Sequence, residues 1–435
     1  MSDATFTCPD LTSFCRLDGL GLEVTGQRIE PDRAILACRP VDADDWCRDC
    51  GGQGLIRGSV VRLLSHVPLG WRPTVLHVRL RRYRCIECGR VWRQDTSAAA
   101  EPRSKLSRAA LRWGLEGLVV QHLSMSRIAA GLDVAWNTAN DAVLAEGQRV
   151  LISDLARFDG VKVIGVDEHC WRHTRHGEKY VTVIIDLTPT RDGTGPARLL
   201  DMVEGRSKHV FKTWLAARPR AWRKGIEVVA MDGFTGYKTA AVEELGNATT
   251  AMDPFHVVRL AGEALTRCRQ RVQQDTCGHR GRAGDPLYRA RRTLLTGVDL
   301  LTDKQVARLE ALFADEQHTE VYATWSIYQR LVVAYRHPDK QLGRFLLQGV
   351  IDSVSTGVPR DLVELVSLGR TLHRRAADVL AFFDRPGTSN GPTEAINGRL
   401  EHLRGIALGF KNLTHYIARS LLETGGFKPH LHPAL

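Results

Sequence analysis

Residues 161–171, VKVIGVDEHCW, combine a short apolar run rich in β-branched residues with an aspartate at its end. Such a run predicts a buried strand, which would hold the Asp167 carboxylate rigidly. A similar stretch occurs at 226–237, IEVVAMDGFTGY, where Asp232 follows the apolar residues. We therefore expect two strands that each deliver an aspartate to the same edge of one sheet.

The sequence around these two stretches alternates between strand and helix patterns. Further strands are predicted at YVTVIIDLT (180–188), ARLLDMVEG (197–205) and TTAMDPF (249–255). Helices are predicted at 207–218, 237–246 and 256–272, where apolar residues recur at helical spacing. This order of elements predicts an α/β fold with a mixed sheet.

Two aspartates at neighbouring strand ends can bind Mg²⁺ or Mn²⁺, which prefer oxygen ligands. A third carboxylate would let two ions sit ~3.5–4 Å apart, which is the ribonuclease-H-like arrangement for phosphodiester transfer. The best candidate for this third acid is Glu394 in TSNGPTEAINGRLEHLRGIALGFKN (388–412), where Asn397, Glu401 and Arg404 follow near one helix face. From the residues alone, a solvated amphipathic helix, in which a lone glutamate has no special role, is the favoured interpretation of this segment.

Other acids compete for these roles. Glu168 should point to the opposite face of its strand from Asp167, and Asp186, Asp201 and Asp253 also end apolar runs. Asp253 and His256 lie together at a strand end, which favours either a supporting role in catalysis or a helix N-cap with a buried histidine.

Four of the ten cysteines are organised in pairs. WCRDCGG contains Cys47 and Cys50, and RCIECG contains Cys85 and Cys88, each pair being followed by glycine. Two such knuckles can complete a tetrahedral, structural Zn²⁺ site, and the alternating residues between them predict a hairpin as in a zinc ribbon. Disulfides and redox pairs are the alternatives. Cys8, Cys15, Cys38, Cys170, Cys268 and Cys277 show no comparable pattern.

The chain carries a formal net charge of +11, and most of the excess lies between Arg57 and Arg112, where thirteen Lys/Arg face three acids. A focused positive charge suits a polyphosphate such as DNA, although a solvated basic face would give the same composition. The candidate DNA contacts in this segment are Arg81, Arg82, Arg84, Arg90 and Arg93.

A helix-turn-helix is predicted directly after the basic segment. In SMSRIAAGLDVAWNTANDAVLAEG (124–147), Ser124 can cap a short helix, Gly131 breaks it, and a second helix begins near Ala135. The second helix of such a motif enters the major groove by its N-terminal end. The candidate DNA contacts there are Trp136, Asn137, Thr138 and Asn140.

Residues 270–385 read as consecutive helices that interrupt the core. The candidate DNA-binding residues of this insertion are Arg280, Arg282, Arg289, Arg291 and Arg292. Trp325 is better explained by helix packing. The expected segments are a zinc-binding DNA-binding module (1–98), a helix-turn-helix (99–155), the first part of the ribonuclease-H-like core (156–270), an all-helical insertion (271–385), and the last part of the core with the C-terminal helices (386–435).

Four blocks, in order, resemble the DDE transposases of bacterial insertion sequences in the ISL3 family: VIGVDEHCW, VVAMDGFTGYKTA, AMDPFHVVRLAGEAL and SNGPTEAINGRLEHLRGIALGFKN. The cysteine knuckles and the WNTA helix resemble the DNA-binding half of the same family. The resemblance implies a catalytic triad of Asp167, Asp232 and Glu394. It also implies recognition of terminal inverted repeats, hydrolysis at the element's ends, strand transfer to target DNA, and a homo-oligomer in a synaptic complex.

Two alternatives remain open at this stage. One is a domesticated zinc/helix-turn-helix regulator of DNA with an inactive nuclease-like core, and the other is a nuclease acting on another nucleic acid. The apolar runs are shorter than the ~20 residues that span a bilayer, and no leader pattern precedes them. We therefore expect a cytoplasmic protein with no membrane partner.

Overall fold

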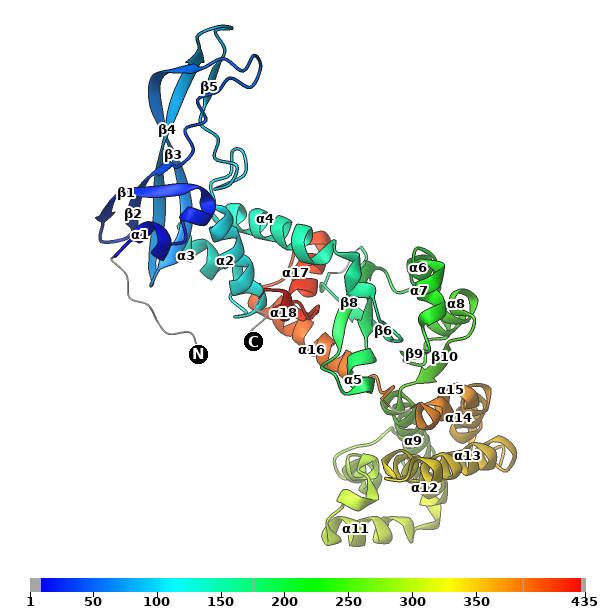
Figure 1. Ribbon diagram of the computed structural model, residues 1–435. Helices are drawn as coiled ribbons and strands as arrows, with labels where there is room; N and C mark the ends of the chain where they lie inside the picture. The colour runs from blue at the N-terminus through cyan, green and yellow to red at the C-terminus, as the bar shows by residue number, and fades with distance from the viewer. Residues whose placement is uncertain (1–8, 175–176, 386, 432–435) are drawn as a thin grey trace. The chain divides into compact units, whose positions relative to one another are not determined.

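A computed structural model describes residues 9–174, 177–385 and 387–431 (Figure 1). The described residues form two compact units, one made of residues up to 155 together with those from 405, and the other made of residues 156–404. Cys8 and the outer ends of the expected 1–98 and 386–435 segments lie outside the described residues.

A five-stranded sheet forms the larger part of the first unit. Its strands are β1 (Leu22–Ile29), β2 (Ala34–Pro40), β3 (Gly54–Leu69), β4 (Arg72–Cys85) and β5 (Val91–Arg93). The order is β1-β2-β4-β3, with β5 paired to β4, and the antiparallel β3–β4 pair is the long hairpin that the alternating pattern predicts. Alternate residues of β4 (Leu76, Val78 and Leu80) are buried in the core of this unit.

Helices complete the first unit: α1 (Leu11–Phe14), α2 (Arg108–Val119), α3 (Met125–Gly131), α4 (Trp136–Gly147), α17 (Leu413–Thr424) and α18 (Lys428–Leu431). Ser124 caps α3 as predicted, since its side chain accepts a hydrogen bond from the backbone N–H of Arg127. α17 packs against α2 and α4, and Leu422 lies so close to Gly147 that a Cβ there would be 2.9 Å from Leu422 Cδ1. The C-terminal helices therefore group with the first unit, which differs from their expected place in the core.

The second unit contains a mixed sheet of five strands: β6 (Val163–Cys170), β7 (Tyr180–Asp186), β8 (Arg198–Glu204), β9 (Val228–Met231) and β10 (Thr249–Met252). The order is β10-β9-β6-β7-β8, parallel from β10 to β6 and antiparallel from β6 to β8. The mixed α/β sheet was predicted, but β6 does not end at Asp167. It continues to Cys170 because residues 167–170 stay paired with β7.

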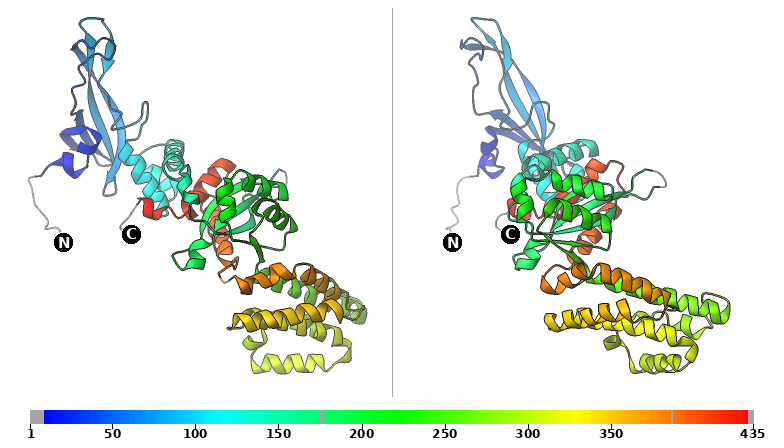
Figure 2. Two further views of the ribbon diagram at one scale, coloured as in Figure 1. Left: turned by 45° about the vertical axis from the view of Figure 1, so that its right-hand side comes forward. Right: turned by 90° about the vertical axis from the view of Figure 1, so that its right-hand side faces the viewer.

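Helices α5 (Thr188–Asp192), α6 (Lys208–Ala216), α7 (Arg220–Gly225) and α8 (Thr235–Leu245) accompany this sheet. Phe211, Trp214 and Tyr237 of α6 and α8 pack with Ile184 and Val229 of the sheet in one buried cluster. Figure 2 shows α6, α7 and α8 covering one face of the strands. The sheet is thereby a rigid support for residues at its edge.

The predicted insertion is helical among the described residues (Figures 1 and 2). It contains α10 (Pro286–Ala290), α11 (Asp303–Phe313), α12 (Thr319–Arg336), α13 (Lys340–Thr356), α14 (Val363–Arg374) and α15 (Ala376–Asp384). These helices share one hydrophobic core with α9 (Pro254–Cys277), which crosses the expected boundary at residue 270 without a break. Trp325 packs at the edge of this core, with its ring 5.1 Å from that of Phe313.

Candidate functional site

Asp167 lies in β6, and Asp232 directly follows the neighbouring parallel strand β9 of the second unit. Val166 of β6 is the register partner of Met231 of β9, so the residue after each is an aspartate at the same level of the sheet. Asp167 accepts a hydrogen bond of 2.8 Å from the backbone N–H of Glu168, and Asp232 accepts one of 2.9 Å from that of Phe234. Backbone N–H groups one and two residues further along the chain thus orient the two carboxylates at the same edge of the sheet.

Glu394 is brought to the same place by α16 (Gly391–Ile406), whose first turn contains it. A cavity of about 250 Å³ has all three acids in its wall; its lining residues are Asp167, Glu168, Asp232, Asp253, Phe255, His256, Arg259, Asn390 and Glu394. The structure therefore places together the three carboxylates that the sequence separates by 65 and 162 positions.

The start of α16 is tied by a hydrogen bond to Asp253, the residue that follows β10, and it packs closely on β6. The backbone N–H of Asn390 donates a 2.9 Å hydrogen bond to Asp253 Oδ1, and the carbonyl of Asn390 accepts from the N–H of Glu394 at 3.0 Å. Gly165 of β6 faces Thr393 so closely that a Cβ at this glycine would be 2.6 Å from Thr393 Oγ1. A glycine in β6 thus allows the helix that carries Glu394 to approach the strand that carries Asp167.

One turn after Glu394, Asn397 reaches Asp167 directly. Its Nδ2 donates a 3.0 Å hydrogen bond to Asp167 Oδ2, so this carboxylate accepts bonds at both oxygens. Asn397 was a predicted supporting residue, and its contact links the helix to Asp167 in the cavity wall. Arg404, the other predicted residue on this helix, forms an ion pair with Glu401.

Burial and nearby negative charge act together on Asp167. Burial raises the pKa of this carboxyl to about 7, and the charges of Asp232, Glu168 and Glu394 contribute in the same direction. The hydrogen bond from Glu168 opposes this rise only in part. A divalent cation would relieve both the burial cost and the repulsion, and a set of oxygen donors fits a hard ion such as Mg²⁺.

The carboxylates do not form a compact cluster like that of the cysteines. Among the described residues, the only group of three or more metal-ligating side chains with ligand atoms within 4.8 Å of one another is the cysteine group. The acids instead line a space between them, which suits ions that keep water in their coordination shell.

Asp253 and His256 both border the cavity, but the structure gives Asp253 a clear local role. It is the N-cap of α9, accepting a 3.3 Å hydrogen bond from the N–H of His256, while its other oxygen binds Asn390. Burial lowers the pKa of His256, which favours the neutral ring. Arg259, which the sequence analysis did not single out, lies beside it with Nη2 3.0 Å from His256 Nδ1.

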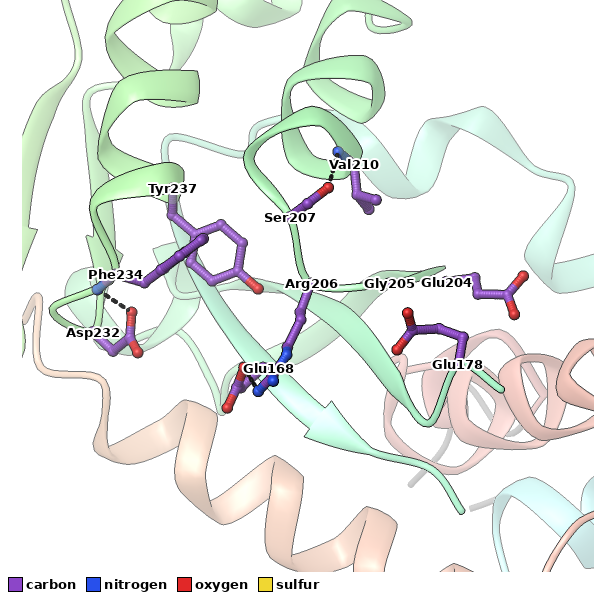
Figure 3. Close-up of a pocket in the computed structure, with 10 residues that line it drawn as sticks. All are labelled: Glu168, Glu178, Glu204, Gly205, Arg206, Ser207, Val210, Asp232, Phe234 and Tyr237. Atoms are coloured by element: carbon purple, nitrogen blue, oxygen red, sulfur yellow. Dashed lines mark hydrogen bonds and ion pairs between the residues drawn. The ribbon is translucent and has the colours of Figure 1, made fainter. Parts of the chain in front are cut away.

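The remaining competitors have other partners. Asp186 binds Arg198 at 2.9 Å, and Asp201 accepts from Trp214 Nε1 at 2.8 Å. Glu168 pairs with Arg206 at 3.0 Å in the wall of a second cavity of about 770 Å³, which also contains Asp232 and Phe234 (Figure 3). Glu168 therefore borders both cavities, and its side chain is held toward Arg206.

The four predicted zinc ligands meet in the first unit. The Sγ atoms of Cys47 and Cys88 are 3.6 Å apart and those of Cys50 and Cys85 are 3.4 Å apart. Gly51 and Gly89, which follow the two knuckles, have φ values of 75° and 73°, a conformation that favours glycine. Backbone N–H groups of Cys88 and Glu87 lower the pKa of the Cys85 thiol to about 7, which favours the thiolate form that binds metal.

The arginines predicted to contact DNA are exposed along the same hairpin. Arg81, Arg82, Arg84, Arg90 and Arg93 all have exposed side chains. Within the described residues, Arg81, Arg82 and Arg84 form no ion pair, whereas Arg90 pairs with Asp49. Unpaired arginines remain available for phosphate groups.

The four residues of α4 that were predicted to contact DNA differ in their exposure to solvent. Trp136 and Asn137 are exposed and Thr138 is partly exposed. Asn140 is only 3% exposed and donates to Asp141 at 3.1 Å, so the prediction that it contacts a base is not supported by its position. Asn140 lies on the side of α4 that packs against α17, where its Nδ2 is 3.5 Å from His415 Nδ1.

A comparison with protein families identifies the class of protein: residues 164–420 match the model of a transposase family. The match covers more than half of the chain and includes Asp167, Asp232 and Glu394. The chain belongs to the ISL3 family of DDE transposases, as the resemblance of its sequence blocks indicates.

Two curated transposases are similar over most of their length. The transposase for insertion sequence element IS1557 of Mycobacterium tuberculosis is 25% identical over 337 residues, which are 72% of this chain and 72% of that protein. The transposase for insertion sequence element IS1001 of Bordetella parapertussis is 23% identical over 304 residues, covering 69% and 70% of the two chains. In the described part of the chain, no helix is long and apolar enough to cross a membrane.

Proposed function

We propose that this transposase cleaves and joins DNA at the cavity formed by Asp167, Asp232 and Glu394. One observation carries the proposal: three carboxylates that lie far apart in the sequence line a single cavity of about 250 Å³ at the sheet edge. The sheet order, with three antiparallel strands continued by two parallel ones, supports a ribonuclease-H-like core in which these acids occupy the catalytic edge.

The three acids would hold two Mg²⁺ or Mn²⁺ ions. When bound, such ions activate the attacking oxygen and stabilise the leaving oxygen of a phosphodiester. The protein's own residues supply the geometry. Asn397 fixes the orientation of Asp167 through a bond to Oδ2, and Asp253 fixes the start of the helix that carries Glu394.

DNA recognition is assigned to the first unit. Cys47, Cys50, Cys85 and Cys88 would bind a structural Zn²⁺ ion in a zinc-ribbon-like module, and α3 and α4 would act as a helix-turn-helix. Exposed Trp136 and Asn137 would meet the DNA from α4, and the unpaired arginines of β4 would bind phosphates. The expected DNA partners are the terminal inverted repeats of the element and the target DNA, bound by a homo-oligomeric synaptic complex.

The decisive experiment uses the full chain with Mg²⁺ and a labelled inverted-repeat end. We expect the wild type to cleave this DNA, and Asp232→Asn or Glu394→Gln to lower the cleavage rate by at least 10³-fold while DNA binding is kept. Glu401→Gln is the matched control, since Glu401 lies on the same helix and pairs with Arg404 outside the cavity. Its cleavage rate should stay near that of the wild type.

The same experiment can contradict the proposal in two ways. A wild type that binds the repeat with no cleavage in Mg²⁺ or Mn²⁺ would favour a DNA-binding regulator. Cleavage that is unchanged in Asp232→Asn would place the catalytic site elsewhere.

A further inference from the structure

Arg375 connects the helical insertion to the chain that follows Asp232. It lies at the junction of α14 and α15 and is only 7% exposed. Its Nη1 donates a 3.1 Å hydrogen bond to the carbonyl oxygen of Gly233, across 142 positions of sequence. The insertion therefore contacts the residue immediately after one of the three acids of the cavity.

Asp378, one helical turn later, holds Arg375 in this position. Its Oδ2 accepts from Arg375 Nε and from Lys238 Nζ, the latter at 2.8 Å, and its Oδ1 accepts from Thr250 Oγ1 at 2.6 Å. Lys238 belongs to α8 and Thr250 to β10, so the aspartate joins the insertion to two elements of the core. Because Asp378 is only 2% exposed, these bonds are made in a low-dielectric environment that strengthens them.

The short segment from Asp232 to Phe234 is held on several sides. The N–H of Phe234 bonds to the Asp232 carboxylate, and the ring of His256 lies so close to Gly233 that a Cβ there would be 2.3 Å from Nε2. The bond from Arg375 fixes the remaining group, the Gly233 carbonyl. The Gly233 carbonyl and the Phe234 N–H belong to the same peptide group. Without the bond from Arg375, this peptide could rotate, and the Phe234 N–H would no longer orient the Asp232 carboxylate.

One donor group of this arginine is left unpaired. Arg375 Nη2 is buried and has no hydrogen-bond partner among the described residues, an arrangement that costs stability. Buried groups that are retained despite such a cost often serve a site rather than the fold.

We propose that Arg375 is a positioning residue for Asp232, through which the helical insertion sets the geometry of the metal-binding cavity. This inference rests on the proposed function, because it assigns Arg375 an effect on the metal site only if Asp232 binds metal. The insertion would then be part of the catalytic apparatus.

Arg375→Lys tests the proposal with little change in charge or volume. Lysine can pair with Asp378, but it has no planar fork that bonds an aspartate and a carbonyl at once. We expect normal folding and DNA binding, a cleavage rate at least tenfold lower, and a higher Mg²⁺ concentration for half-maximal rate. Mn²⁺ binding to the protein without DNA, followed by electron paramagnetic resonance, should be weakened in parallel.

Arg374→Ala is the matched control, because Arg374 is the preceding residue and is exposed. It should leave both the rate and the Mn²⁺ affinity unchanged. If Arg375→Lys does not fold, Thr250→Val removes one donor to Asp378 and should shift the metal dependence in the same direction by a few-fold.

Parallel measurements on Asp232→Asn separate the two hypotheses. If Asp232→Asn is inactive and Arg375→Lys keeps the wild-type rate and Mn²⁺ affinity, the positioning role is overturned while the catalytic site stands. If Asp232→Asn cleaves DNA and binds Mn²⁺ like the wild type, the proposed catalytic site fails, and this inference fails with it. A loss in Arg375→Lys that is matched by equal losses of thermal stability and DNA binding would show a purely structural role.

Discussion

Asn397 donates a 3.0 Å hydrogen bond to Asp167 across 230 positions of sequence. The bond joins a helix that follows a long insertion to the first strand of the core, at a carboxylate that lines the acidic cavity. Because it ends on a half-buried carboxylate surrounded by other acids, it should matter more for the orientation of Asp167 than for overall stability.

Removal of this bond should lower catalysis selectively. We expect Asn397→Ala to reduce the DNA cleavage rate by about 10- to 100-fold, since a hydrogen bond to a charged group contributes ~1.5–3 kcal/mol. Binding of the inverted-repeat DNA should be unchanged. Gly398→Ala is the control, because a Cβ at Gly398 meets nothing within 4 Å. Equal cleavage by Asn397→Ala and the control would contradict a role for this bond.

Gly165→Ala should separate α16 from β6. The added Cβ would be 2.6 Å from Thr393 Oγ1 and 3.2 Å from Leu187 Cδ1, and overpacking of this kind costs about 1–3 kcal/mol. We expect a lower melting temperature and loss of cleavage. The double variant Gly165→Ala/Thr393→Ala should recover part of both, whereas Gly225→Ala, which meets nothing within 4 Å, should behave like the wild type. No recovery in the double variant would show that Thr393 is not the obstacle.

The cysteine group should bind about one zinc ion per chain. Cys50→Ser is expected to lower the zinc content measured by mass spectrometry, to destabilise the first unit, and to weaken DNA binding, because zinc binding contributes directly to the folding of such modules. Cys277→Ser changes an exposed thiol outside the group and serves as the control. Full zinc content in Cys50→Ser would argue against a four-cysteine site.

Arg81→Gln and Arg84→Gln should each weaken DNA binding uniformly over different sequences. Each loss of one phosphate contact should reduce the slope of log K against log salt concentration by about 0.9. Arg39→Gln removes an exposed arginine of the same unit that is already paired with Glu23 at 2.7 Å, so its slope should stay close to that of the wild type. If all three variants have equal slopes, β4 is not a phosphate-binding surface.

His66 should make the first unit less stable in acid. Burial lowers the pKa of His66 from 6.5 to about 4, and its Nδ1 lies 2.8 Å from Ser107 Oγ. Between pH 6.5 and pH 4 the unfolded chain binds a proton that the folded protein does not. The free energy of unfolding should therefore fall with decreasing pH through this window, by up to about 3 kcal/mol. The free energy of unfolding of His66→Gln, measured by urea denaturation, should depend less on pH than that of the wild type. If the two proteins show the same pH dependence, His66 does not cause it.

Several features of this protein could be predicted from the sequence because they depend on local patterns. Apolar runs mark strands, so Asp167 and Asp232 could be assigned to one sheet edge before the register Val166–Met231 was known. The spacing within each cysteine pair is a local property as well, and it predicted the group that the structure forms. The capping serine predicted the start of α3, but Gly131 is the last residue of that helix, and the turn before α4 lies after it, with Asp133 at φ 51°.

Other features depend on contacts between residues far apart in the chain, which local patterns do not encode. No periodicity indicates that Glu394 returns to the sheet after 162 residues, that Asn140 is buried beside α17, or that Arg375 reaches Gly233. The sequence by itself determined the strands, the knuckles and the two aspartates, because short-range apolar periodicity and ligand spacing suffice for these. Only the tertiary structure decided which acid, amide and arginine complete the cavity, because the close approach of α16 and α15 to the sheet depends on packing at positions such as Gly165 and Asp378.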